Sequence, residues 1–261
     1  MFDFHMHSTV SFDGISSARD MAEAAAKVGL REICFTDHWD DHFTPEETPD
    51  LFSLEDYARA YDGLSVEGVT IRRGVEFGLT TWNREGLTAL LQERPFDFVI
   101  GSVHYVDGTD PYYAEFWQGR CAEDAFRSYL EETLRCVRLH DGFDVLGHLT
   151  YVCKSAHNPT HEPLRYEPYA ELCDEIMRTL VAKGKGMEIN TSGVDRAGVF
   201  LPDATFLRRF RELGGEIVTL GSDAHSTDRV GQYSAEALAI LRDIFGYVCT
   251  FESRKPIFHR L

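Results

Sequence analysis

The chain of 261 residues is poor in basic residues, with 26 lysines and arginines against 43 aspartates and glutamates. Its formal net charge is therefore −17 at pH 7. A protein with this excess of acids repels the phosphodiester backbone of DNA and RNA, so we expect no nucleic-acid partner. The charge does not exclude a small phosphate ester, provided that the site itself carries local positive charge.

Long apolar runs are also absent, since no stretch approaches the ~18 consecutive apolar residues of a membrane span. The first residues, MFDFHMHST, lack the basic region and the apolar run of a signal peptide. These absences predict a protein with no membrane partner and a cytoplasmic location. The sequence gives no basis for an oligomeric state.

Cysteine is sparse and scattered, with six residues and no C-x-x-C pair. We interpret these cysteines as reduced thiols, because a chain of this length can bury a core without disulfides. No G-x-G-x-x-G follows the first apolar run, which weakens the case for a dinucleotide-binding fold.

What the sequence does contain is a regular alternation of short apolar runs and longer segments of helical periodicity. Strands are expected at 2–5, 32–36, 69–76, 97–104, 143–148, 186–190 and 216–222, with a weaker one at 247–253. Helices are expected at 17–28, 54–66, 85–93, 122–139, 166–183, 203–213 and 234–245. Seven βα units without a linker predict an α/β barrel of parallel strands, folded as a single domain over 1–261. The segment 105–121 is either a lid over a site or a surface loop.

Histidines and acids stand at the ends of six of the seven predicted strands. They are His5 and His7, His38, Glu76, His104, His148, and Asp223 with His225. Side chains at positions i and i+2 of an extended segment point the same way, so each pair of this set can face one centre. Carboxyl ends of barrel strands converge on one face, and imidazoles with carboxylates suit Zn, Fe or Mn. The pattern predicts a metal centre.

The same residues lie in motifs that resemble the PHP family, named for polymerase and histidinol phosphatase. The motifs are D-F-H-M-H-S (3–8), S-F-D-G (11–14), T-D-H (36–38), G-V-E (74–76), G-S-V-H (101–104), G-H-L (147–149) and G-S-D-A-H (221–225). Together with E-I-N-T-S-G (188–193), they resemble the stand-alone histidinol-phosphatase type. The resemblance implies a distorted (β/α)7 TIM-like barrel with three divalent metal ions.

The resemblance also implies a division of the ligands, in which Asp13 joins the eight strand-end residues. One metal is expected at His5, His7, Glu76 and Asp223, and a second at Asp13, His38 and His148. A third is expected at His104 and His225, with Glu76 bridging to the first. Asp3 and Asp37 are expected to orient imidazoles from behind.

Three residues are candidates for binding the substrate. Arg196, just after N-T-S-G, stands where the family tends to keep a basic residue, and we expect it to clamp the phosphate. Lys154 stands in the place of a basic pair common in the family, which reads Cys153-Lys154 here. His42 is near enough to His38 along the chain to touch the substrate.

The implied activity is metal-dependent hydrolysis of L-histidinol phosphate in histidine biosynthesis. A metal-bridging hydroxide would attack phosphorus in line, with Glu76, Asp223, His225 and Asp13 as the catalytic residues. Three alternatives stay open at this point. They are a PHP phosphoesterase acting on nucleotides or other small phosphate esters, a metal-dependent amidohydrolase, and a metal-binding module without activity.

Overall fold

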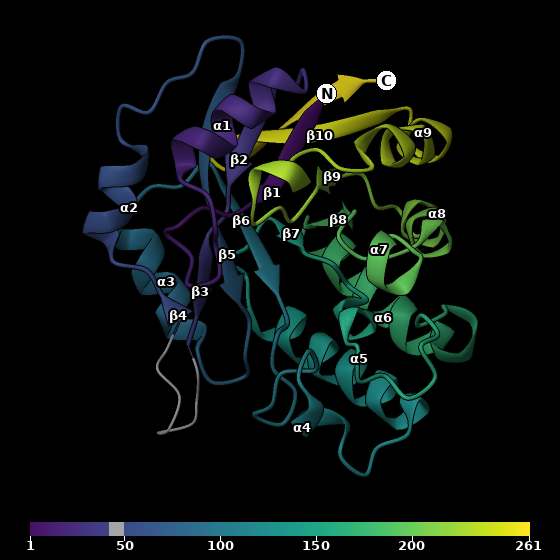
Figure 1. Ribbon diagram of the computed structural model, residues 1–261. Coiled ribbons are helices and arrows are strands. Elements are labelled where there is room, and N and C mark those ends of the chain that lie inside the picture. The colour runs from purple at the N-terminus through teal and green to yellow at the C-terminus, as the bar shows by residue number, and fades with distance from the viewer. Residues whose placement is uncertain (42–49) are drawn as a thin grey trace.

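The computed structural model describes residues 1–41 and 50–261, and its centre is a nearly closed barrel of seven parallel strands (Figure 1). In spatial order the strands are β1 (Phe2–Met6), β2 (Glu32–Phe35), β5 (Thr70–Gly78), β6 (Phe98–Ser102), β7 (Val145–Leu146), β8 (Gly186–Asn190) and β9 (Val218–Gly221). The α/β barrel expected from the sequence is thus confirmed.

The barrel closes between its first and last strands at one level only. There the Asp223 backbone N–H donates to the His5 carbonyl (2.7 Å), and the His7 N–H donates to the Ala224 carbonyl (2.9 Å). The only bridge between the two strand segments joins Met6 and Ala224. The barrel therefore closes where the H-M-H segment (5–7) meets the D-A-H segment (223–225).

Helices surround the strands in Figure 1. The long ones are α1 (Ala18–Lys27), α2 (Leu54–Tyr61), α3 (Arg84–Glu93), α5 (Ala122–Leu139), α6 (Ala170–Ala182), α8 (Ala204–Glu212) and α9 (Ser234–Ile244). In α1, the Ser17 hydroxyl accepts the Asp20 N–H as an N-cap, and Met21, Ala22 and Ala25 form the buried face. All seven were expected, although α2 ends five residues earlier than its pattern suggested.

Short elements in the connections escaped the periodicity analysis. They are β3 (His38–Asp40), β4 (Asp50–Leu51), α4 (Ala114–Trp117), α7 (Val194–Ala197), and the 3-10 turns η1 (Tyr151–Lys154), η2 (Glu167–Tyr169) and η3 (Thr227–Arg229). Two to four residues are too few to show a period of 2 or 3.6. Several of them carry side chains that line the site described below.

The last strand, β10 (Tyr247–Glu252), does not extend the barrel. It pairs antiparallel with an unpredicted strand, β11 (Lys255–Arg260), in a sheet of its own. Phe251 and Cys249 of β10 pack with Phe4, Cys34, Phe98, Ile100 and Val145 in an apolar cluster inside the barrel. On β6, Phe98 and Ile100 join this cluster whereas Val99 faces the outer core, as the alternation along a strand requires.

Two composition-based expectations can be compared with the described residues. All six cysteines are free thiols, five of them buried. Within residues 1–41 and 50–261, no helix combines the length and the apolar character needed to cross a bilayer.

Candidate metal centre

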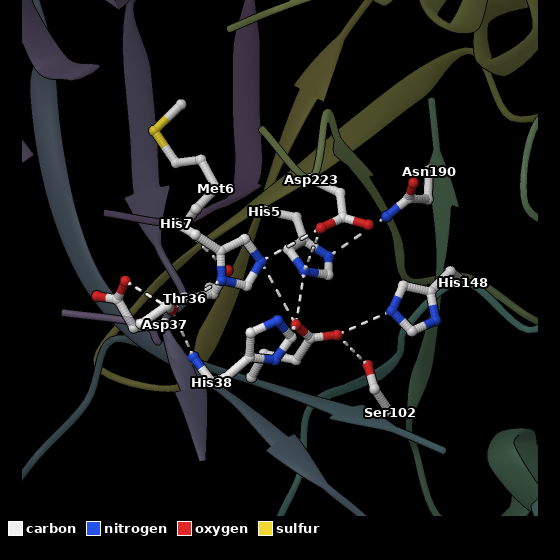
Figure 2. Close-up of polar contacts among 12 residues, drawn as sticks. His5, Met6, His7, Thr36, Asp37, His38, Ser102, His148, Asn190 and Asp223 are labelled. Atoms are coloured by element: carbon white, nitrogen blue, oxygen red, sulfur yellow. Dashed lines mark hydrogen bonds and ion pairs between the residues drawn. The ribbon is translucent and has the colours of Figure 1, made fainter. Parts of the chain in front are cut away.

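The carboxyl ends of the barrel strands bring all nine predicted ligands to one place. His5 lies in β1 and His7 one residue beyond it, Glu76 lies in β5, and His38 opens β3 beside it. His104 and His148 follow β6 and β7 by two residues each, and Asp223 and His225 follow β9. In Figure 2 the side chains of His5, His7, His38, His148 and Asp223 point toward one another.

Glu76 is fully buried at the middle of this cluster and contacts five imidazoles. Its Oε1 lies 2.8 Å from His148 Nε2 and 3.3 Å from His104 Nε2. Its Oε2 lies 3.1 Å from His5 Nε2, 3.2 Å from His38 Nδ1 and 3.5 Å from His7 Nε2. A carboxylate with ring nitrogens on both oxygens has the geometry of a bridging ligand.

The two other predicted acidic ligands, Asp13 and Asp223, each lie close to two imidazoles. Asp13 Oδ2 lies 2.9 Å from His225 Nε2 and 3.7 Å from His38 Nε2. Asp223 Oδ1 lies 3.3 Å from His7 Nε2 and 3.7 Å from His5 Nε2.

The side chains group differently from the division that the resemblance implied, because His148 and His225 exchange places. His148 lies beside His104, with their Nε2 atoms 3.4 Å apart, whereas His225 lies with Asp13 and His38. The reason is topological. β6 and β7 are neighbours in the sheet, so the residues that follow them meet. His225 follows β9, whose extension pairs with β1, and the loop after β1 carries Asp13; the Ile15 N–H in that loop donates to the His225 carbonyl.

The donor atoms of this cluster fit metal ions better than they fit one another. Buried atoms without a hydrogen-bond partner among the described residues include His5 Nε2, His7 Nε2, His225 Nε2 and Glu76 Oε2. Buried polar atoms without partners are costly and rare. Nitrogen and carboxylate donors that converge in groups of three or four are the ligands of Zn, Fe and Mn. The described residues could therefore hold several such ions, with Asp40 as an additional candidate donor.

Electrostatics set His7 apart from its neighbours in the cluster, since carboxylates raise the pKa values of His5, His38 and His104 despite burial. Burial, together with the neighbouring His225 and His38 rings, lowers the pKa of His7 to about 3. The rings of His7 and His225 stack with centroids 4.1 Å apart, so they cannot both carry a proton cheaply. A neutral imidazole is the form that binds a metal.

A second layer of polar groups holds the rings from behind, and it differs from the expected one. Glu188 Oε1 lies 2.7 Å from His5 Nδ1, and Asp40 Oδ2 lies 3.0 Å from His104 Nδ1. Both carboxylates were missed. Asp37 reaches an imidazole only through Ser11. It accepts a hydrogen bond from the Ser11 hydroxyl (3.0 Å), whose oxygen lies 3.1 Å from His7 Nδ1.

Asp3 does not orient an imidazole side chain as expected. Its Oδ1 accepts the backbone N–H of Ser222 (2.9 Å), and its Oδ2 accepts that of Gly231 (3.2 Å). Burial raises the pKa of Asp3 to about 6 against these hydrogen bonds. Asp3 therefore fixes the backbone of the segment that carries Asp223 and His225.

Two glycines of the barrel make room for this second layer. A Cβ on Gly221 would lie 2.2 Å from Glu188 Oε1 and 2.3 Å from the His5 Cβ. A Cβ on Gly78 would lie 1.6 Å from Asp40 Oδ1. The glycine of the G-S-D-A-H motif is thus explained by the close approach of a carboxylate rather than by a turn.

The cluster forms the floor of a cleft of about 1080 Å³, and two of the predicted substrate-binding residues line it. Lys154 Nζ donates to Asp223 Oδ2 (2.8 Å). Arg196 donates to the Tyr112 hydroxyl and lies 5.1 Å from the centre of that ring. Arg229, which was not predicted, lines the same cleft and pairs with Asp195 (2.6 Å). His42 lies outside the described residues.

Comparison with known proteins agrees with this geometry. The model of the PHP domain matches residues 3–192. The chain belongs to the PHP-domain family. That match includes seven of the nine predicted ligands, and Asp223 and His225 lie beyond it.

Relatives of this PHP protein are similar to it over nearly their whole length. The histidinol-phosphatase of Lactococcus lactis is 32% identical over 87% of this chain and 85% of its own. A probable histidinol-phosphatase of Clostridium acetobutylicum is 28% identical over 97% of this chain and 98% of its own.

A solved structure is also similar throughout. The histidinol phosphate phosphatase of Lactococcus lactis, complexed with zinc, L-histidinol and phosphate, matches with a TM-score of 0.89 and 29% identity. The match covers 98% of each chain. The match agrees with the barrel fold and, through the zinc of that complex, with a metal-binding protein.

Proposed function

We propose that this protein is a histidinol-phosphatase, which hydrolyses L-histidinol phosphate to L-histidinol and phosphate. We further propose that residues 1–261 act as one PHP domain. The observation that carries the proposal is the convergence of nine histidine and carboxylate ligands on Glu76, on the floor of a cleft that also contains lysine and arginine. The full-length similarity to histidinol-phosphatases supports the substrate.

Three divalent ions, Zn, Fe or Mn, are the proposed cofactors. His5, His7, Glu76 and Asp223 would hold the first, and Glu76, His104 and His148 the second. Asp13, His38 and His225 would hold the third. Such ions supply a strong nucleophile at neutral pH by acidifying water, and they neutralise charge on the phosphoryl group.

The chain's own residues bind and orient the ester. Lys154 reaches the centre through its contact with Asp223, and Arg196 lies at the same cleft, so both can hold phosphoryl oxygens. Among the nine ligands, Asp13 and His225 have the most exposed side chains, 36% and 23%, whereas His5, His7 and Glu76 are fully buried. The leaving alkoxide would be protonated at this accessible edge by His225 or by water, because His225 and His38 hold the pKa of Asp13 well below its usual range and leave it ionised. The reaction needs no covalent phosphoenzyme.

We also propose a class of substrate and a location for the enzyme. The substrate is a small molecule rather than a nucleic acid, because an acidic chain with a cationic focus in one cleft favours a small anion. The location that we propose for the enzyme is the cytoplasm.

Steady-state kinetics on a panel of phosphate esters test this function. The metal-loaded protein should show its highest kcat/KM on L-histidinol phosphate, and lower values on p-nitrophenyl phosphate, a mononucleotide and single-stranded DNA. Protein stripped with a chelator is the control and should regain activity when Zn, Fe or Mn is returned. If L-histidinol phosphate is no better than p-nitrophenyl phosphate, the substrate assignment is wrong; if no ester is cleaved, the enzyme class is wrong.

A further inference from the structure

The cleft above the metal centre is lined by two kinds of side chain that come from different segments. Lys154, Arg196 and Arg229, from η1, α7 and η3, supply positive charge suited to a phosphate. The segment 105–115 supplies acids and aromatic rings instead: Tyr105, Asp110, Tyr112, Tyr113 and Glu115. A substrate that spans the cleft meets both kinds of group.

Asp110 is the acid of this segment that Tyr151 connects to the metal ligands. Its Oδ1 accepts the Tyr112 backbone N–H (2.8 Å) and the Tyr151 hydroxyl (3.1 Å). The ring of that same Tyr151 lies 5.1 Å from the ring of His104 and 5.0 Å from the ring of His148. One aromatic side chain therefore separates the Asp110 carboxylate from two of the proposed ligands.

The carboxylate of Asp110 is poorly compensated for its position. Among the residues that the structure describes, its Oδ2 has only a longer contact, 3.4 Å from the Tyr151 hydroxyl, although an ionised carboxylate can accept about four hydrogen bonds. Across residues 1–41 and 50–261, no lysine, arginine or histidine forms a salt bridge with Asp110. Burial raises the pKa of Asp110, although the Tyr112 N–H opposes the shift. A positively charged ligand would relieve this cost.

We infer that Asp110 binds a positively charged group on the alcohol portion of the substrate. The site would then select phosphate monoesters of amino alcohols over esters whose alcohol is neutral. The inference rests on the proposed phosphatase function and deepens it, since L-histidinol phosphate carries an ammonium group and an imidazole ring. Tyr112 and Tyr113, which meet edge to face at 5.3 Å, offer flat surfaces for the remainder of such a molecule.

This arrangement also separates the proposed substrate from the alternative one. A mononucleotide carries a neutral base and ribose at neutral pH, so it offers Asp110 no positive charge. A carboxylate next to a neutral group loses its hydration without gaining a charged partner. Nucleotides are therefore expected to bind less well than a zwitterionic ester.

The test compares two substrates on matched variants of the metal-loaded enzyme. Asp110→Asn keeps the shape of the side chain and an oxygen for the Tyr112 N–H, but removes the charge. The control is Asp107→Asn, which changes an exposed acid of the same segment that pairs with Arg120 (3.4 Å). The measured quantity is the ratio of kcat/KM for L-histidinol phosphate to kcat/KM for p-nitrophenyl phosphate.

The ratio should fall about 10- to 100-fold in Asp110→Asn, as for the loss of a charged hydrogen-bond partner, and should be unchanged in Asp107→Asn. A histidinol phosphate analogue that lacks the ammonium group shows which cation is bound. If wild type and Asp110→Asn cleave that analogue equally well, the ammonium is the partner. If Asp110→Asn still lowers kcat/KM for the analogue by the same factor, the imidazole is.

Two results would overturn the inference while leaving phosphatase activity in place. One is an unchanged ratio in Asp110→Asn. The other is an equal fall for both esters, which would mean that Asp110 acts by positioning Tyr151. A wild-type protein that cleaves no phosphate ester would instead overturn the proposed function.

Discussion

At its amino end the barrel is filled by apolar side chains, whereas at its carboxyl end the same strands bring together histidines and carboxylates. The two environments are one or two residues apart along a strand: Phe4 belongs to the apolar cluster and His5 to the metal centre. Strict alternation would place these consecutive residues on opposite faces, and the register of β1 with β2 shifts between Asp3 and Met6, where the apolar cluster gives way to the metal centre.

The two ends of the barrel together explain how a small barrel can contain a buried polar centre. The amino end contributes hydrophobic burial, and the hairpin of β10 and β11 covers it with Phe251 and Cys249. The carboxyl end has buried atoms without partners, which favours metal binding and disfavours tight packing. Turnover should therefore respond to changes at the carboxyl end alone, whereas stability should respond to changes at both ends.

The largest effect is expected from Glu76→Gln, at the centre of the polar end. Replacing the carboxylate that would hold two of the proposed ions should lower turnover by about 10³-fold or more, as for loss of a principal electrostatic group. The metal-free protein should also unfold at a lower temperature, because Glu76 is the anionic partner of five imidazoles and its loss leaves their charge uncompensated. Turnover and thermal unfolding are the measurements, with the exposed helix residue Glu131→Gln as the control. Near-normal turnover in metal-replete Glu76→Gln would contradict the proposed mechanism.

At the apolar end, Phe251→Ala should lower stability without lowering turnover. Phe251 is 2% exposed and its ring lies 4.7 Å from that of Phe98, so its loss should lower the free energy of unfolding by about 3–5 kcal/mol. Phe258→Ala, on β11 of the same hairpin but 50% exposed, is the matched control and should change it by less than about 0.5 kcal/mol. Urea unfolding measures both. Turnover per folded molecule should not change in either variant, and a parallel loss of turnover would mean that the two ends are coupled.

The sequence predicted most of the fold and the membership of the site, for different physical reasons. The bounds of α5 and β8 were expected to the residue, because long amphipathic and apolar segments have a clear period. Eight of the proposed ligands stand at predicted strand ends, where barrel geometry concentrates functional groups. Asp13 lies in a loop, and only family resemblance pointed to it.

What could not be predicted depends on contacts between distant segments. Glu188 and Asp40 hold imidazoles from behind, yet each is an ordinary acid in the sequence. A signal did exist for Glu188, since it is a charge in the otherwise apolar strand G-M-E-I-N. The pairing of His148 with His104 follows from strand order, which the alternation of strands and helices already implied. β11 was missed because its side chains are mostly exposed or half-buried.

Glu188→Gln tests the layer behind the metal centre and should have an intermediate effect. Glu188 accepts from the His148 backbone N–H (2.9 Å) and the Asn190 amide (3.1 Å) with the oxygen that does not contact His5. A glutamine must place an NH₂ against either His5 Nδ1 or these donors. Metal affinity, measured by competition with a chelator, should fall about 10- to 100-fold.

The exposed Glu216→Gln is the control for this variant, since it changes a glutamate in the loop before β9 without touching a ligand. It should bind metal like the wild type. Equal affinity in Glu188→Gln would show that the imidazole orientation is determined by packing alone.

The smallest effect is expected at the turn of the hairpin, which ties it to the barrel. Arg254 donates from Nη2 to Asp144 Oδ1 (2.9 Å), and its backbone has φ of 65°, a conformation that favours glycine. Arg254→Ala should lower the free energy of unfolding by about 1.5 kcal/mol, the low end for a charged hydrogen bond because the side chain is partly exposed. Arg254→Gly loses the same pair but relieves the backbone, so it should recover roughly 1 kcal/mol of that loss. Urea unfolding of the two variants side by side separates the ion pair from the backbone conformation. If both variants are equally destabilised, the positive φ of Arg254 does not lower the stability of the protein, and the loss of the ion pair accounts for the whole effect.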